Sequence, residues 1–176
     1  MVIAAIGQAV AQPAAADDPN ARLLALVNAE RAKAGQPALT LEPRLTTAAC
    51  RHAIDLAHGG PLSHRGRDGS DLGDRLTRSG YPFAMAAENL AAGITTPDET
   101  VWLWSGSPGH RRNMLTAEFG EAGVAHRTGA GGDVWVLVLG ARRFPAGNRR
   151  KENIENTVQS DDFPDDLRGD NAITCY

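Results

Sequence analysis

Three polar side chains of this sequence stand at the edges of predicted elements, in glycine-rich surroundings. They are His64 in Leu-Ser-His-Arg-Gly, Glu88 in Ala-Glu-Asn-Leu and His110 in Ser-Pro-Gly-His-Arg-Arg-Asn. Two neutral imidazoles and a carboxylate are a reasonable ligand set for Zn²⁺, with one position left for water or substrate. About two dozen residues separate each from the next, so spacing alone does not unite them. Three unrelated surface residues are the simpler interpretation at this point.

Other motifs offer weaker chemistry. Ser107 resembles the nucleophile of a Gly-x-Ser-x-Gly turn, but Ser105 stands where that motif needs glycine and a helix is predicted where it needs a strand. The glycines between Thr128 and Asp133 lack the spacing of a dinucleotide-binding loop and are followed by a predicted strand. Neither a phosphate-binding loop nor a two-histidine zinc helix motif occurs in the sequence.

The remaining histidines have structural interpretations. His52 lies among apolar residues of a predicted helix, which favours a buried structural role. His58 stands at the end of that helix, where its charge suits the helix dipole. His126 lies in a strand near a loop, and we expect its side chain to be exposed.

Five helices are predicted from capping residues and apolar spacing. The first follows Asp18-Pro19, a typical N-cap and first-turn pair, and stops before Gly35. The fourth begins at Thr96-Pro97, where Glu99 is placed to complete a capping box. The others are predicted over residues 43–58, 71–78 and 108–114, and Ser107 is the expected cap of the last one.

The strand pattern lies mainly in the last third of the predicted domain. Residues 38–42 form a short extended connection, and residues 123–125 and 134–139 form a hairpin whose second strand is apolar on both faces. Helices outside a small sheet predict the α/β class, with an α-β-α sandwich around a small, mainly antiparallel sheet.

The two ends of the sequence differ from its middle. Residues 1–16 are small, apolar and uncharged and contain two Ala-x-Ala sites, so we interpret them as the remnant of a signal peptide and expect export. The middle, residues 17–145, is the predicted domain. Residues 146–176 carry all of the net charge of −3 and have few large apolar residues, which predicts a disordered acidic tail; a docking role is the alternative.

Composition excludes several classes of protein. An overall charge of −3 and a pI near 5.9 make a nucleic acid a poor partner. Two cysteines, Cys50 and Cys175, are too few for a disulfide scaffold. The sequence is compatible with one disulfide bridge between them and equally with two unpaired thiols. The apolar stretch at the start is too short to cross a bilayer, so the sequence predicts no transmembrane segment.

Seven segments in a fixed order resemble the CAP superfamily of cysteine-rich secretory, antigen 5 and pathogenesis-related proteins, in its short bacterial branch. They are residues 26–31 (Leu-Val-Asn-Ala-Glu-Arg), Leu45 with the alanine-rich second helix, Ser63-His64, Gly80-Tyr81, Ala87-Glu88-Asn89-Leu90, Trp104 with residues 107–114, and Gly123-Val124. The resemblance covers residues 20–143.

The resemblance implies that His64, Glu88 and His110 meet in one cleft. Members outside bacteria carry a fourth, acidic residue three positions after the helix tryptophan, where this sequence has Ser107. The resemblance therefore implies a secreted, monomeric binding module with lipid, sterol or cell-envelope partners. The alternative is a divalent-metal hydrolase in which His64, Glu88 and His110 hold Zn²⁺ and Glu88 is the candidate catalytic base.

Overall fold

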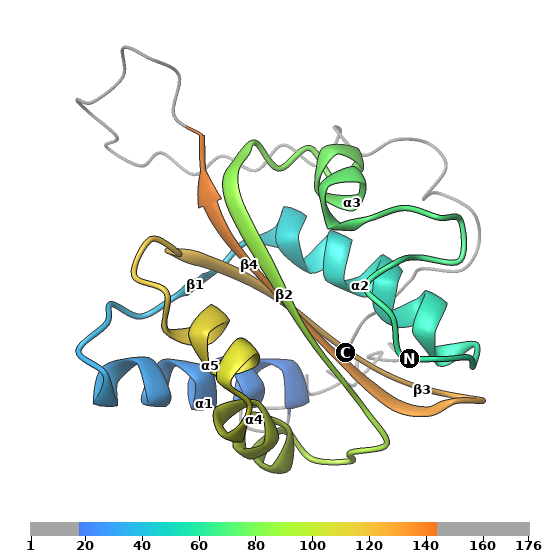
Figure 1. Cartoon of the computed structure of the whole chain (residues 1–176), viewed down its shortest axis with the longest axis horizontal. Coiled ribbons are helices and arrows are strands. Elements are labelled where there is room, and N and C mark those ends of the chain that lie inside the picture. The colour runs from blue at the N-terminus through green and yellow to red at the C-terminus, as the bar shows by residue number, and fades with distance from the viewer. Residues whose placement is uncertain (1–17, 144–176) are drawn as a thin grey trace, which may run out of the picture.

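The computed structural model describes residues 18–143 and shows an α-β-α sandwich (Figure 1). Helices α2 and α3 lie on one side of a four-stranded sheet, and α1, α4 and α5 lie on the other. The elements in chain order are α1 (Pro19–Lys33), β1 (Thr40–Leu41), α2 (Pro43–Ala57), α3 (Leu72–Arg78), β2 (Phe83–Ala92), α4 (Pro97–Gly106), α5 (Pro108–Leu115), β3 (Glu121–Gly129) and β4 (Gly132–Arg142). The predicted α/β class is confirmed.

The helices begin where the capping residues predict. The Asp18 side chain accepts a hydrogen bond from the backbone N–H of Asn20, and Thr96 accepts one from Glu99. Asp71 and Asp74 form a reciprocal capping box at the start of α3. Each such cap satisfies a backbone donor that the first helical turn leaves without a partner. Ser107 is the exception, because it precedes α5 without a side-chain capping bond.

The sheet has the order β1-β3-β4-β2, so β2 is an edge strand. β1 pairs with β3 in parallel, and the other two pairs are antiparallel. β2 is not among the predicted strands, because its sequence Phe-Ala-Met-Ala-Ala-Glu-Asn-Leu-Ala-Ala lacks β-branched residues. Pairing along nearly the whole length of β4 imposes the extended conformation there.

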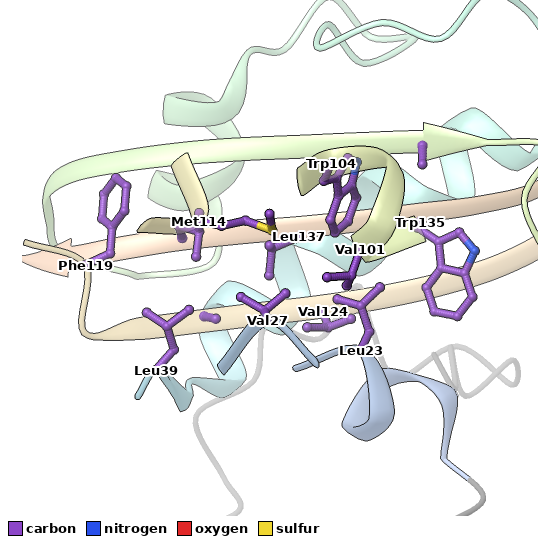
Figure 2. Close-up of a cluster of buried hydrophobic side chains, with 13 residues drawn as sticks. Leu23, Val27, Leu39, Val101, Trp104, Met114, Phe119, Val124, Trp135 and Leu137 are labelled. Atoms are coloured by element: carbon purple, nitrogen blue, oxygen red, sulfur yellow. The ribbon is translucent and has the colours of Figure 1, made fainter. Parts of the chain in front are cut away.

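Two hydrophobic cores lie on the two faces of the sheet. One holds Trp104 and Trp135 together with residues of α1, α4 and α5, as Figure 2 shows. The other packs α2 and α3 on Leu90, Val136 and Val138. β4 supplies both cores alternately and is buried over residues 134–140, which confirms that its two faces are covered.

Two of the three remaining histidines occupy the predicted environments. His52 is fully buried, and the His58 ring bonds the carbonyl of Ile54 at the end of α2 (2.7 Å). The prediction for His126 is wrong. Its ring stacks on Trp135 with centroids 4.0 Å apart and bonds Asp133 (2.9 Å), because the β3–β4 register sets His126 directly opposite Trp135.

The expectations for residues 1–16 and 146–176 lie outside the described residues, as does Cys175. Cys50 itself is buried on α2, and its pairing with Cys175 stays a prediction. None of the helices within residues 18–143 has the length and apolar character needed to cross a membrane.

Candidate functional site

Glu88 is the centre of the candidate site. It lies on β2 opposite Val138 of β4, and only 2% of its side chain is exposed. One carboxylate oxygen bonds Nδ1 of His64 (2.8 Å), and the other accepts a hydrogen bond from a terminal guanidinium nitrogen of Arg75 (2.8 Å). A buried carboxylate requires such partners, because burial of an unpaired charge is strongly unfavourable.

Arg75 fixes both the carboxylate and the segment that carries His64. It projects from α3, and 3% of its side chain is exposed. Besides Glu88, its guanidinium donates to the backbone carbonyls of His64 (3.3 Å) and Ser70 (3.2 Å). Two sets of contacts therefore hold the connection between α2 and α3 against β2. The His64 side chain bonds Glu88 directly, and the His64 carbonyl accepts from Arg75, which also bonds Glu88.

His64 is the exposed member of this group. Its side chain is 62% exposed, and its Nδ1 faces a carboxylate, which accepts but cannot donate when ionised. In the neutral ring Nδ1 therefore carries the hydrogen, and Nε2 keeps a free lone pair. The site thus presents one imidazole nitrogen of defined orientation to solvent.

His52 lies behind the carboxylate. Its Nε2 is 3.8 Å from Glu88 and bonds the carbonyl of Ser63 (2.9 Å), while its Nδ1 is buried without a hydrogen-bond partner. Burial is the main cause that lowers the pKa of His52, and the nearby Arg75 charge adds to it. The ring is therefore neutral at pH 7 and completes the buried wall of the site.

His110 reaches the site from the opposite layer. Side chains of consecutive strand residues point to opposite faces, so Asn89 faces α5 while Glu88 faces α2 and α3. The Asn89 amide donates to the carbonyl of His110 (3.0 Å), and Asn113 donates to the Asn89 side-chain oxygen (2.9 Å). Because β2 is an edge strand, segments from the two layers approach each other around it.

Two causes lower the pKa of His110. Burial lowers the pKa of His110, and the charge of His64 lowers it further. Its ring lies 6.4 Å from the buried ring of Trp104, and its Nδ1 is buried without a hydrogen-bond partner. Within residues 18–143, this buried nitrogen thus remains without a donor or acceptor.

Ser107 lies between α4 and α5, one turn before His110. It ends the first helix and precedes the second, and its hydroxyl makes no capping bond. A pocket of about 580 Å³ lies beside the α4–α5 turn, and neither Ser107 nor His110 is among its lining residues. Of the four predicted site residues, the structure joins His64 and Glu88 directly and sets His110 close by.

As arranged, the site does not offer three free metal ligands. Both oxygens of Glu88 already have partners, and one of these partners is the cationic guanidinium of Arg75. Within residues 18–143, no group of three or more His, Cys, Asp or Glu side chains is placed to hold a metal ion. Two imidazoles remain, whereas a catalytic zinc site usually has three protein ligands.

Arg75 and Asn89 were not predicted as site residues. The signal for Arg75 was available, because an arginine stands beside Leu72 and Leu76 on the apolar face of a predicted helix. The side of the sheet that Asn89 faces could not be predicted. Because β2 was not predicted as a strand, its consecutive side chains were not expected to point to opposite faces.

Comparison with known proteins gives a consistent match. The model of the cysteine-rich secretory protein family, CAP, matches residues 24–139. The Bacillus subtilis (strain 168) protein YkwD is 30% identical over 115 residues, which are 65% of this chain and 44% of that protein. This chain therefore spans less than half the length of that relative.

Solved structures agree with the fold. An extracellular protein with an SCP domain from Bacillus anthracis is 26% identical, with a TM-score of 0.62, over 69% of this chain and 39% of that one. An outer surface protein from Borrelia burgdorferi, 24% identical, has a TM-score of 0.64 over 69% of this chain and 91% of its own. The second similarity is one of fold alone.

Proposed function

The chain belongs to the cysteine-rich secretory protein (CAP) family, and from that premise we propose that it is an extracellular or periplasmic binding module. The proposed partner is a lipid, a sterol or another cell-envelope component, bound by a monomer at the face that carries His64, Ser107 and His110. The extracellular SCP-domain protein of Bacillus anthracis supports this location.

One observation carries the proposal, namely that the acidic group of the site is already fully engaged. Glu88 is bonded by His64 and Arg75 and is almost completely buried. A general base must reach the proton that it removes, and a metal-ligating carboxylate needs a free oxygen. The carboxylate instead orients His64, whose exposed ring can donate to or accept from a bound partner.

Affinity enrichment from a cell-envelope extract of the native host tests this proposal. The bait is the full chain, compared with the His64→Ala/His110→Ala double variant and with His58→Ala. His58 is an exposed histidine at the end of α2, outside the site, and serves as the matched control. We expect the wild type and the control to enrich the same component and the double variant to lose it. Equal enrichment by all three would contradict a role for these histidines.

A metal-dependent hydrolase is the second candidate, with a site at His64, Glu88 and His110. Its support is the His64–Glu88 bond, since zinc-bound histidines usually donate their second nitrogen to a carboxylate, carbonyl or water. The donor set falls short of a catalytic zinc site, because Glu88 is held by Arg75. We therefore derive no hydrolytic step.

Calorimetric titration with Zn²⁺ separates the two candidates. Micromolar or tighter binding by the full chain that is lost in His64→Ala/His110→Ala and kept in His58→Ala would favour the hydrolase. We expect no such binding. In that case the enrichment experiment decides whether the same histidines bind an organic partner.

A further inference from the structure

We propose that the acidic segment 161–167 of this chain, Asp-Asp-Phe-Pro-Asp-Asp-Leu, docks into the pocket beside the α4–α5 turn. The α4–α5 pocket is the hollow of about 580 Å³ that is lined by Ser105, Gly106, Pro108, Arg111, Arg112, Leu115 and Thr116.

The pocket combines cations with an apolar floor. Arg111 and Arg112 are both exposed, and neither guanidinium has a hydrogen bond or an ion pair within residues 18–143. Guanidinium groups bind carboxylates with two parallel hydrogen bonds, so an unpaired adjacent couple suits an acidic ligand. Pro108 and Leu115 supply apolar surface between these charges.

One of the two hydroxyl groups in the pocket also lacks a partner within residues 18–143, whereas the other, that of Thr116, donates to the carbonyl of Arg112 (2.8 Å). The Ser105 hydroxyl oxygen is buried and has no hydrogen-bond partner. An unsatisfied buried hydroxyl is unusual in a native protein, and a docked polar group would satisfy it. The pocket therefore offers an acidic peptide both charged and neutral hydrogen-bond partners.

The acidic segment has the complementary chemistry. Four aspartates surround Phe163, and Leu167 closes the segment. The aspartates match the two arginines in charge, and the volume of the pocket accommodates an aromatic side chain with its flanking backbone. A peptide of this composition is the kind of ligand that paired arginines over an apolar floor select.

The path of the chain makes the contact reachable. The backbone N–H of Gly120, four residues after Thr116 of the pocket, donates to the carbonyl of Gly140 (3.3 Å). The described chain ends only three residues later, at Arg143, so it leaves the sheet near the end of α5. Asp161 follows eighteen residues after Arg143, a stretch that can span at most about 60 Å. Tethering then raises the effective concentration of the segment at the pocket.

The expected consequence concerns the candidate site. Ser105 and Pro108 flank Ser107, and His110 follows in the first turn of α5. The pocket therefore adjoins the candidate site along the chain. The docking itself does not depend on what the candidate site binds.

Backbone amide NMR spectra of the full chain test the proposal. Asp161→Asn, Asp162→Asn, Asp165→Asn and Asp166→Asn are combined in one variant, and Arg111→Gln/Arg112→Gln form another. The controls are Glu152→Gln/Glu155→Gln, which neutralise acids outside the segment, and Arg65→Gln/Arg67→Gln, which neutralise exposed arginines elsewhere.

Docking predicts reciprocal effects. The aspartate variant should shift the amide signals of residues 105–116, and the Arg111/Arg112 variant should shift those of residues 161–167. A nuclear Overhauser contact between the Phe163 ring and the Leu115 methyls should be present in the wild type and lost in both variants, but kept in both controls. Raising the ionic strength to about 1 M, where the Debye length is about 3 Å, should weaken the contact.

Two results would overturn the proposal. One is an aspartate variant that shifts only its own neighbours and leaves residues 105–116 unchanged. The other is a contact that grows with protein concentration, since that would assign the segment to the pocket of a second copy. The charge exchange Arg111→Asp/Arg112→Asp with Asp161→Arg/Asp162→Arg should restore the contact that each half alone abolishes.

Discussion

Glu88 owes its role to its neighbours. A glutamate in a ten-residue alanine-rich strand carries no intrinsic information about burial or partner. In the folded chain it accepts bonds from His64 and Arg75, while His52 lies 3.8 Å away. Its charge is therefore compensated inside the protein, and its removal would leave the buried guanidinium of Arg75 without a counter-ion.

Glu88→Gln tests this compensation at the residue scale. We expect it to lower the free energy of unfolding by about 3–5 kcal/mol, because it leaves the buried charge of Arg75 without its partner. Urea unfolding measures the effect. Glu30→Gln is the control, because Glu30 pairs with the exposed Lys33, and this substitution should cost less than about 1 kcal/mol. Equal losses for the two variants would contradict the buried ion pair.

Close approaches between elements hold the sandwich together. At Gly123 of β3 an added Cβ atom would overlap the backbone carbonyl carbon of Leu45, because α2 crosses the strand directly there. On the other face, Arg31 of α1 is fully buried and donates to the carbonyls of Pro37, Met114, Thr116 and Phe119. The first contact sets the distance between two layers, and the second fixes the connection from α5 to β3.

Gly123→Ala is expected to destabilise the protein by about 1–3 kcal/mol or more, because α2 must move away from the sheet. Thermal unfolding followed by circular dichroism checks this. Gly120→Ala is the matched control, since a Cβ atom at Gly120 meets open space. A control that costs as much as Gly123→Ala would contradict the close approach as the cause of the loss.

Arg31→Met should cost about 3 kcal/mol or more, because it leaves several buried carbonyls without a donor. Its control is Arg22→Met on the same helix, whose guanidinium pairs with Asp98 at the surface. Hydrogen exchange gives a second measurement. In Arg31→Met, amides in residues 114–122 should lose protection before those of β4. Uniform loss of protection would contradict a local clamp.

At the scale of the whole molecule, the edge strand β2 lets two separately packed layers contribute to one site. Each layer has its own core, and both cores share β4. His64 comes from the layer of α2 and α3, and His110 comes from the layer of α4 and α5. Each layer also carries a histidine that is shielded from solvent, namely the fully buried His52 and the partly buried His110.

The pH dependence of stability follows from these histidines. Burial lowers the pKa of both His52 and His110 below the ordinary value near 6.5. As the pH falls through 6.5, the unfolded chain binds protons at these rings before the folded chain does, so the free energy of unfolding decreases. Each unit of difference in pKa contributes at most about 1.4 kcal/mol.

Urea unfolding at pH 7.5, 6.5 and 5.5 measures this loss. His110→Gln should remove part of the dependence in that range. Carboxyl groups with lowered pKa, such as Asp98 and Glu121, titrate at lower pH and act outside this window. An unchanged slope in His110→Gln would contradict the assignment.

The sequence by itself determined the helices, the β3–β4 hairpin and the family resemblance. Caps such as Asp18-Pro19 and Thr96-Pro97 act within one helical turn, so the local sequence is sufficient to predict where those helices begin. The continuous apolar run 134–139 likewise predicts a strand that is buried on both faces. The resemblance singled out His64, Glu88 and His110 from order along the chain.

Only the tertiary structure decided what these residues contact. β2 is extended because β4 pairs with it, and Arg75 meets Glu88 because α3 packs beside that strand. His126 is covered because the register brings Trp135 opposite it. Such contacts join residues far apart in the chain, and no local pattern encodes them, since each depends on the position of an element elsewhere.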